Sequence, residues 1–315
     1  MSATELPSLD DVLAARRRIA GYVIETPSIA RDGLAYKLEF LQHTGAFKVR
    51  GALNTALQLE PEERERGIVA VSGGNHGLAV AYVGRVLGIA ATVVMPNTTP
   101  AFMVDRARSD GAEVILTETI VGAFAKTDEL VRAGRTLVHP FDDVRVIAGQ
   151  ATIALEMLEQ IPDADVYLLS IGGGGLLAGF ASVVKQRKPE ARVVGVETRG
   201  ADAMRLALDA GKPVTLRAIT SIARTLGAPA VTERTLRAVQ RYVDEVVVVD
   251  DRDAVAAIVE LQETLGILVE PAAACTLAAL RLGLVRASRP ALLMCGCNVG
   301  LDELAGWRLR FITSS

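Results

Sequence analysis

The sequence predicts an α/β protein built from two doubly wound, mostly parallel α/β domains. Apolar, strand-like runs alternate with stretches in which apolar residues recur three and four positions apart, as in parallel sheets covered by helices. Two glycine-rich segments, residues 72–77 and 172–175, each link a predicted strand to a predicted helix. A length of 315 residues fits about two domains. Because ligands of open α/β sheets bind beyond the carboxyl ends of the strands, these turns predict a ligand-binding cleft.

The expected elements follow from these patterns. The first helix begins after Ser8, whose side chain can form a capping box with Asp11. The uninterrupted apolar runs 246–249 and 292–294 predict strands with helices on both faces. Residues 139–143, His-Pro-Phe-Asp-Asp, have the composition of a crossover loop. The predicted strands are 67–71, 91–95, 113–116, 165–170, 192–197, 245–250 and 291–295. The predicted helices include 77–87, 100–109, 149–160, 176–188, 233–242 and 251–265.

Composition excludes several classes of protein. Half of the residues are hydrophobic and 23% are charged, which is typical of a globular chain and excludes intrinsic disorder. The 34 basic and 37 acidic residues give a net charge of −3, and aromatic residues make up only 4%. Since nucleic-acid surfaces need a basic surplus and stacking side chains, this balance argues against a nucleic-acid partner.

The cysteines and the N-terminus predict a cytoplasmic protein. Cys275, Cys295 and Cys297 are too few for a disulfide framework and lack the spacing of a zinc site, so reduced thiols are expected. The first 21 residues carry acidic side chains among the apolar ones, unlike a signal peptide. No uncharged apolar run approaches the roughly 20 residues of a membrane span, so no membrane partner is expected.

The strongest local signal is the run of four glycines at positions 172–175. Successive glycines let the backbone approach a ligand closely, and free N–H groups at the start of the following helix favour a phosphate. The same run fits the dinucleotide fingerprint Gly173-x-Gly175-x-x-Ala178, with Glu197 placed for a ribose hydroxyl. An NAD-dependent dehydrogenase is therefore a second interpretation. Against it, three predicted strands precede this turn, and the loop at 72–77 would have no role.

Lys48 is the candidate nucleophile. It lies between Phe47 and Val49 in a polar, glycine-flanked turn that leads into an apolar helical run. Taken alone, a lysine is most often a solvated surface charge. If its amine is desolvated, it becomes a nucleophile able to form a Schiff base. A phosphate cradle together with one such amine indicates pyridoxal phosphate (PLP) as the cofactor.

Two further segments offer binding groups. Residues 72–77, Ser-Gly-Gly-Asn-His-Gly, follow a strand and open a helix, so their amides favour an anion such as a substrate carboxylate. The alternative role of Asn75 and His76 is to cap that helix. Cys295 ends the last predicted strand and so belongs at the edge of the cleft, although a buried cysteine is more often a small apolar residue.

Taken in this order, the segments resemble the fold-type II PLP enzymes, and within them the family of threonine dehydratases and serine racemases. The resemblance covers nearly the whole chain and is carried by LQHTGAFKVRGALN, VSGGNHGLAVAY, HPFDDVRVIAGQATIALE, SIGGGGLLAGF, VEPAAA and MCGCNVGLDEL. It implies an architecture like that of the tryptophan synthase β subunit, with the cofactor in the cleft between two domains. Residues 1–52 and 143–315 would form the large PLP-binding domain, and residues 53–142 the small domain with the substrate-carboxylate loop.

The resemblance also implies a role for each matched residue. Lys48 would be the Schiff-base lysine and the catalytic base, with Phe47 packed beside the cofactor. Asn75 would bind the 3-hydroxyl of the cofactor, and Cys295 would face its pyridine nitrogen. The substrate carboxylate would be held by Ser72, Gly73, Gly74, Asn75 and His76. The cofactor phosphate would be held by Gly172, Gly173, Gly174, Gly175 and Leu176.

The implied activity is elimination of water from a β-hydroxy amino acid, L-threonine or L-serine, giving a 2-oxo acid and ammonia. A neutral thiol at Cys295, in place of an aspartate, makes the cofactor a weaker electron sink, which suffices for elimination. Alternatives are a serine racemase, a dehydratase of 3-hydroxyaspartate or phenylserine, and a cofactor-binding protein without catalysis. Racemases carry a serine where this chain has Gly73, which favours a dehydratase, while the adjacent Ser72 keeps a racemase open.

The cation site of the family is only partly matched. Glu197 and the carbonyl of Ala201 would fit its first two ligands. The third ligand position falls on Ala203, with Asp202 one residue early, so a bound divalent or monovalent cation is doubtful.

Three other features depart from the family pattern. The segment between Pro27 and Lys37 is shorter than usual, and Ala46 replaces a serine, so either change could reshape the substrate pocket. The chain ends soon after residues 295–304, so no C-terminal regulatory domain and no feedback inhibition by isoleucine are expected. A homodimer is expected from the family.

Overall fold

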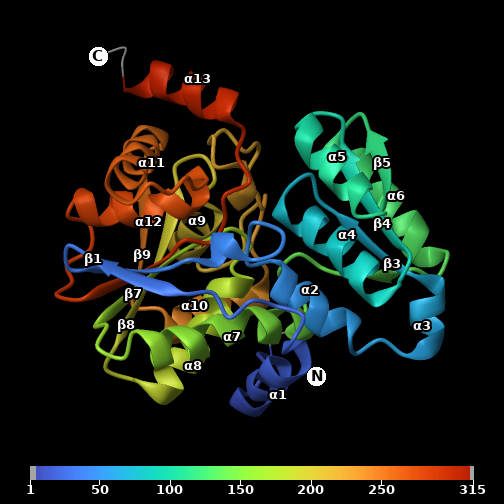
Figure 1. Cartoon of the computed structure of the whole chain (residues 1–315), viewed down its shortest axis with the longest axis horizontal. Helices are drawn as coiled ribbons and strands as arrows, with labels where there is room; N and C mark the ends of the chain where they lie inside the picture. The colour runs from blue at the N-terminus through green and yellow to red at the C-terminus, as the bar shows by residue number, and fades with distance from the viewer. Residues whose placement is uncertain (1–4, 313–315) are drawn as a thin grey trace. The chain divides into compact units, whose positions relative to one another are not determined.

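The computed structural model describes residues 5–312 and divides the chain into two compact units. Unit 1 comprises residues 1–6, 25–41 and 153–315, and unit 2 comprises residues 7–24 and 42–152. Residues 1–4 and 313–315, which the predicted large domain includes, lie outside the described residues. Each unit contains its own sheet with helices around it (Figure 1), so the predicted α/β fold with two mostly parallel sheets is confirmed.

Unit 2 has a parallel sheet in the order β5-β4-β3-β6. The strands step outward from β3 to β5, and the chain then returns to β6 on the other side of β3. Because parallel crossovers are right-handed, this reversal places α4 and α5 on one face and α6 on the other (Figure 1). Its elements are α1 (Leu9–Ile19), α2 (Val49–Ala56), α3 (Pro61–Arg66), β3 (Ile68–Val71), α4 (Asn75–Leu87), β4 (Ala91–Pro96), α5 (Ala101–Ser109), β5 (Glu113–Thr117), α6 (Ile120–Arg132) and β6 (Thr136–Leu137).

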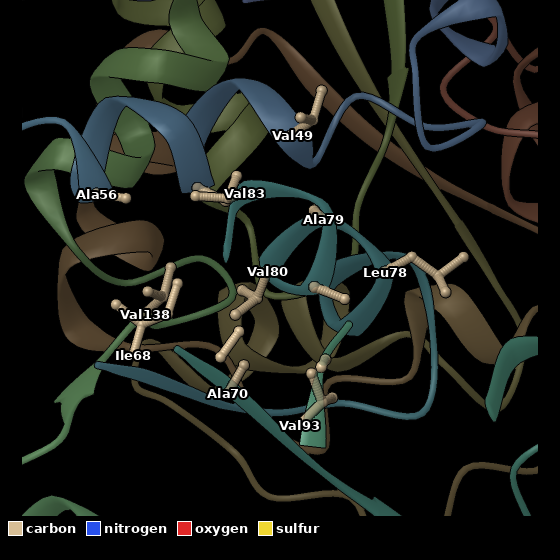
Figure 2. Packing of buried hydrophobic residues seen from close by; sticks show 14 of the residues in the cluster. Val49, Ala56, Ile68, Ala70, Leu78, Ala79, Val80, Val83, Val93 and Val138 are labelled. Atoms are coloured by element: carbon tan, nitrogen blue, oxygen red, sulfur yellow. The ribbon is translucent and has the colours of Figure 1, made fainter. Parts of the chain in front are cut away.

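The period of two along β3 assigns its side chains to two cores. Ile68 and Ala70 pack in one cluster with residues of α4 and α2, while Val69 and Val71 pack in another with Ala123 of α6. Figure 2 shows the first cluster, in which side chains from β3, β4, α4 and α2 meet. A strand that is buried on both faces reads as the continuous apolar run seen in the sequence.

Unit 1 has a sheet in the order β1-β2-β10-β7-β8-β9, parallel except for the β1–β2 pair. The chain moves outward from β7 to β9 and returns to β10 on the other side of β7, so α8 and α10 lie on one face and α11 and α12 on the other (Figure 1). Helix α7 (Val144–Gln160) runs from unit 2 into unit 1. The other elements of unit 1 are β1 (Ser28–Arg31), β2 (Leu34–Lys37), β7 (Val166–Ser170), α8 (Gly175–Arg187), β8 (Arg192–Thr198), α9 (Ala203–Ala210), α10 (Glu233–Tyr242), β9 (Glu245–Val249), α11 (Asp251–Leu265), α12 (Pro271–Arg281), β10 (Pro290–Leu293), α13 (Leu301–Phe311) and the short 3-10 turns Glu39–Leu41 and Arg224–Leu226.

Most predicted elements are confirmed to within a few residues, and so are both glycine-rich turns and the loop at 139–143. The capping box of α1 is present, with the Asp11 N–H donating to Ser8 Oγ at 3.2 Å and the Ser8 N–H to Asp11 Oδ2 at 2.9 Å. Among the described residues, no helix has both the length and the apolar character that crossing a membrane requires.

One expectation was wrong, and one element was not predicted. The run 246–249 was predicted to be covered on both faces, but β9 is the edge strand of its sheet, and Val247 and Val248 remain partly exposed. The shortened segment before Lys37 is a hairpin of β1 and β2 that the patterning did not predict. Its two-residue turn has a φ of 52° at Asp32 and 79° at Gly33, as the tight hairpin turns with positive φ require.

Candidate active site

The sheet of unit 2 reverses its winding between β3 and β6, and the predicted catalytic residues of this unit gather there. Ligands of open α/β sheets bind at such a switch point, beyond the carboxyl ends of the two strands. The loop 72–74 follows β3, and the loop 138–143 follows β6. Since β3 and β6 are paired in parallel, both loops leave the sheet at the same edge.

Lys48 is the residue before α2, and its amine is held by the loop after β6. Its Nζ donates to the carbonyl oxygen of Pro140 at 2.7 Å and lies 5.1 Å from the ring centroid of the buried Phe47. Helix α2 is fixed by close contact with α7, because a Cβ on Gly149 would lie 2.7 Å from the Cα of Gly51. Lys48 is therefore a partly buried amine in a fixed position, and not the solvated surface charge that lysine usually is.

His76 lies in the first turn of α4 and is almost fully buried. Its Nε2 is 2.7 Å from the carbonyl oxygen of Val138, which can only accept, so Nε2 carries the proton. Burial, together with the positive charge of Lys48, lowers the pKa of His76 to about 3. Among the described residues its Nδ1 has no hydrogen-bond partner. The imidazole is thus neutral, with a buried acceptor nitrogen.

The loop 72–76 has the geometry of an anion site. The Gly74 N–H donates to Ser72 Oγ at 3.1 Å, and α4 begins at the buried Asn75. The first N–H groups of a helix lack partners within it, and the helix dipole adds positive potential there. The structure brings Ser72, Gly73, Gly74, Asn75 and His76 into this turn at the same switch point as Lys48.

In unit 1 the winding reverses between β7 and β10, and the predicted phosphate cradle follows β7. Gly174 is the N-cap of α8 with a φ of 89°, a conformation that side chains rarely adopt. A Cβ at this position would lie 2.8 Å from Met204 Cε and 2.9 Å from Thr235 Cβ. The turn therefore needs glycine for both its conformation and its packing, and it presents backbone N–H groups at the start of α8.

Cys295 follows β10 at the other side of this switch point. Its Sγ is 3.5 Å from Oγ of Ser170, the last residue of β7. Both residues are buried. Burial raises the pKa of the Cys275 thiol in helix α12. The chain thus supplies the Cys295 thiol and the Ser170 hydroxyl next to the glycine turn.

Glu197, predicted as a cation ligand or a ribose acceptor, holds the start of α9. Its Oε1 accepts the Met204 N–H at 2.9 Å, and its Oε2 accepts the Arg205 N–H at 2.8 Å. Burial raises the pKa of Glu197 to about 8. The buried Ala201 donates its own N–H to the Thr198 carbonyl at 2.8 Å. Within residues 5–312, no group of three or more His, Cys, Asp or Glu side chains has the arrangement of a metal site.

Sequence reasoning missed three groups near the switch points: the Pro140 carbonyl, the Ser170 hydroxyl and Thr99. The His-Pro-Phe-Asp-Asp segment was interpreted only as a connection, but its His139 Nδ1 accepts the N–H groups of Phe141 at 3.2 Å and Asp142 at 2.8 Å and so shapes the turn that carries Pro140. The available signal was position, because Ser170 ends β7, which borders a switch point, while Pro140 and Thr99 follow β6 and β4, which pair with β3.

Comparison with known proteins identifies the family. A family model described as pyridoxal-phosphate dependent enzyme matches residues 22–296. The chain belongs to this family of PLP-dependent enzymes. The PLP enzyme is 38% identical to a phenylserine dehydratase of Ralstonia pickettii over 97% of both chains. It is 36% identical to an L-threonine ammonia-lyase of Thermotoga maritima, over 94% of this chain and 77% of the relative.

The fold comparison agrees. The structure of maize serine racemase matches the PLP enzyme with a TM-score of 0.91 and 32% identity, over 98% of this chain and 99% of the racemase. The predictions of fold type II and of PLP as the cofactor are confirmed. The NAD-dependent dehydrogenase is set aside, because the glycine run at 172–175 lies within the PLP family match.

Proposed function

We propose that the protein is a lyase that removes water from a β-hydroxy amino acid, L-threonine or L-serine in the first place. The resulting enamine leaves as an imine, which takes up water and hydrolyses to a 2-oxo acid and ammonia. The observation that carries this proposal is the amine of Lys48, held 2.7 Å from the Pro140 carbonyl at the switch point that also bears the anion-binding loop 72–76. The ammonia-lyase and dehydratase relatives support the same reaction class.

Each unit, taken by itself, offers groups suited to one part of PLP. We assign the phosphate to the turn of Gly172, Gly173, Gly174, Gly175 and Leu176, which presents backbone N–H groups at the start of α8. From the resemblance to the family, we assign contacts with the ring to Phe47, Lys48, Asn75 and Cys295. When bound, PLP withdraws electrons from the α-carbon of the substrate and so lowers the barrier to removal of its α-proton.

Lys48 acts as the general base in this proposal. Its Nζ takes the α-proton, and as an ammonium it keeps its hydrogen bond to the carbonyl oxygen of Pro140. The amides of residues 72–76 hold the substrate carboxylate, which fixes the α-carbon in reach of the amine. His76 is neutral at physiological pH, because its pKa is lowered to about 3, and so it adds no positive charge beside Lys48.

The position of Gly73 argues for elimination over racemisation. Racemisation needs a proton donor on each face of the α-carbon, and glycine offers none at the position where racemases carry a serine. The second candidate is a dehydratase of a bulkier substrate, favoured by the similarity to phenylserine dehydratase over nearly the whole chain. A cation at Glu197 and Ala201 stays a weaker proposal, since both Glu197 oxygens already accept backbone N–H groups.

The first experiment is a kcat/KM panel that measures 2-oxo acid release from L-threonine, L-serine, D-serine, 3-hydroxyaspartate and 3-phenylserine. We expect L-threonine or L-serine to have the highest ratio, with D-serine formed from L-serine far more slowly than pyruvate. Lys48→Ala should lower kcat at least about a thousandfold, since it removes the base and the anchoring amine. Release from none of the five substrates would refute the proposal.

Lys48 can be tested without turnover. Borohydride reduction of the yellow holoenzyme should bleach it and add the mass of the cofactor to the peptide that contains Lys48. Label on any other lysine would remove Lys48 from its assigned role.

The proposal extends to assembly, compartment and domains. We expect a homodimer, which light scattering would detect as about twice the chain mass of 33.3 kDa. A cytoplasmic location is likewise proposed, because three cysteines are too few for a disulfide framework and the N-terminal residues are unlike a signal peptide. The functional division into residues 1–52 and 143–315 for the cofactor and 53–142 for the substrate carboxylate is likewise proposed.

A further inference from the structure

The loop that follows β4 lies against the anion-binding loop that follows β3. Strands β3 and β4 are paired in parallel with Val71 opposite Val94, and the Ser72 N–H continues the ladder by donating to the Val94 carbonyl at 3.0 Å. Their carboxyl ends therefore meet at one edge of the sheet. Residues 97–100, which connect β4 to α5, become neighbours of residues 72–74.

Thr99 fills the space that a side chain at position 73 would take. A Cβ on Gly73 would lie 2.3 Å from Thr99 Oγ1 and 3.3 Å from Thr99 Cβ and Cγ2. The Thr99 N–H donates to the Pro96 carbonyl at 2.9 Å, and α5 begins two residues later, so the backbone of Thr99 is fixed. The glycine and the threonine are thus complementary, and the loop has a hydroxyl although Gly73 offers none.

This hydroxyl is buried without a hydrogen-bond partner among the described residues. A buried unsatisfied hydroxyl destabilises a protein, and valine would fill the same volume without that penalty. An unsatisfied hydroxyl directed at the anion-binding loop therefore indicates that a ligand atom able to accept a hydrogen bond completes this site.

We propose that the Thr99 hydroxyl is a positioning group for the substrate, which donates a hydrogen bond to the amino acid carboxylate held by residues 72–76. The inference rests on the proposed function, which supplies the carboxylate. The Thr99 hydroxyl would add a side-chain donor to the backbone amides that hold the carboxylate. It would lie in the space that the side chain of a serine at position 73 would occupy.

The test uses the holoenzyme and L-alanine, an amino acid that carries the carboxylate but has no β-hydroxyl to lose. Thr99→Val should raise the Kd for L-alanine about tenfold, or about 1.4 kcal/mol. It should raise the KM for the best substrate by a similar factor and change kcat less than about threefold. Thr99→Ser should restore the wild-type Kd. The exposed neighbour gives a matched control, since Thr98→Val should leave the Kd unchanged.

Thermal stability separates a binding role from a structural one. The midpoint of Thr99→Val without L-alanine should equal or exceed that of the wild type, because an unsatisfied hydroxyl is removed. Its upward shift on adding L-alanine should be smaller. A lowered midpoint with an unchanged Kd would mean that Thr99 is structural and would overturn the inference. If the wild type turns over substrate but Thr99→Val binds L-alanine with the same Kd as the wild type, the inference about Thr99 is overturned and the proposed function stands. If the wild type shows no turnover, the proposed function itself is refuted.

Discussion

At the residue scale, the neutral state of His76 has a consequence for stability against pH. Burial and the charge of Lys48 hold its pKa at about 3 in the folded chain, against an ordinary value near 6.5. Below pH 6.5 the unfolded chain binds a proton that the folded chain does not. The free energy of unfolding should therefore fall by about 1.4 kcal/mol per pH unit from this residue alone, until the pH reaches about 3.

Urea unfolding between pH 6 and pH 4 measures this slope. His76→Gln should remove about 1.4 kcal/mol per pH unit from it, since glutamine keeps a donor for the Val138 carbonyl but does not titrate. His43 is exposed, so His43→Gln is the matched control and should keep the wild-type slope. Equal slopes in wild type and His76→Gln would contradict the neutral, buried imidazole.

Lys37 and Glu156 form a buried ion pair inside unit 1. The Lys37 Nζ is 2.6 Å from Glu156 Oε2 and also donates to the Thr26 carbonyl at 2.5 Å. Lys37→Met would leave a buried carboxylate without its cation, which costs about 3–5 kcal/mol of unfolding free energy. Lys37→Met with Glu156→Leu should recover most of the loss. Urea unfolding of the three proteins checks this, and a loss below about 1 kcal/mol for the single change would argue against it.

At the element scale, the turn between β7 and α8 should tolerate no side chain at Gly174. Gly174→Ala would strain a φ of 89° and place a Cβ 2.8–2.9 Å from Met204 and Thr235. Gly211 ends α9 with a φ of 68° and has open space around it, so a methyl group there would strain the backbone without a steric clash. We expect Gly211→Ala to lower the free energy of unfolding by about 1 kcal/mol, and Gly174→Ala to lower it by about 1–3 kcal/mol more.

The same pair of variants links the turn to the cofactor. Gly174→Ala should weaken PLP binding, measured by equilibrium titration of the cofactor absorbance, because the turn must shift to admit the methyl group. Gly211→Ala should bind PLP as the wild type does. Equal PLP affinity in both variants would remove the turn at residues 172–175 from the phosphate site.

The sequence predicted best the strands that are buried on both faces of their sheet. All four residues of β3 are buried, and a strand covered on both faces is what a continuous apolar run indicates. The β1–β2 hairpin was missed because its strands have four residues each, and β1 is mostly exposed. The coverage of β9 was wrong because the sequence does not reveal which strand lies at the edge of a sheet.

At the scale of the whole molecule, the sequence predicts those parts of the site that lie in continuous sequence motifs. Lys48 and the two glycine-rich turns stand in recognisable segments. The Pro140 carbonyl and Thr99 could not be found in this way, because they lie 92 residues after Lys48 and 26 residues after Gly73. Strand order brings them to the site, and strand order follows from the complete fold.

The whole chain should gain stability from its cofactor. A ligand that binds only the folded chain stabilises it by RT ln(1 + [L]/Kd), which is about 2.7 kcal/mol when free PLP is a hundred times its Kd. Since each kcal/mol raises the Tm of a unit of this size by roughly 2–4 °C, the expected rise is about 5–10 °C. Calorimetry of cofactor-free enzyme with increasing PLP measures it. The Tm of Lys48→Ala should rise less on adding PLP, because its bond to PLP is lost. The Tm of Gly211→Ala should rise as much as that of the wild type. A wild-type Tm that does not depend on PLP concentration would mean that the cofactor does not select the folded chain.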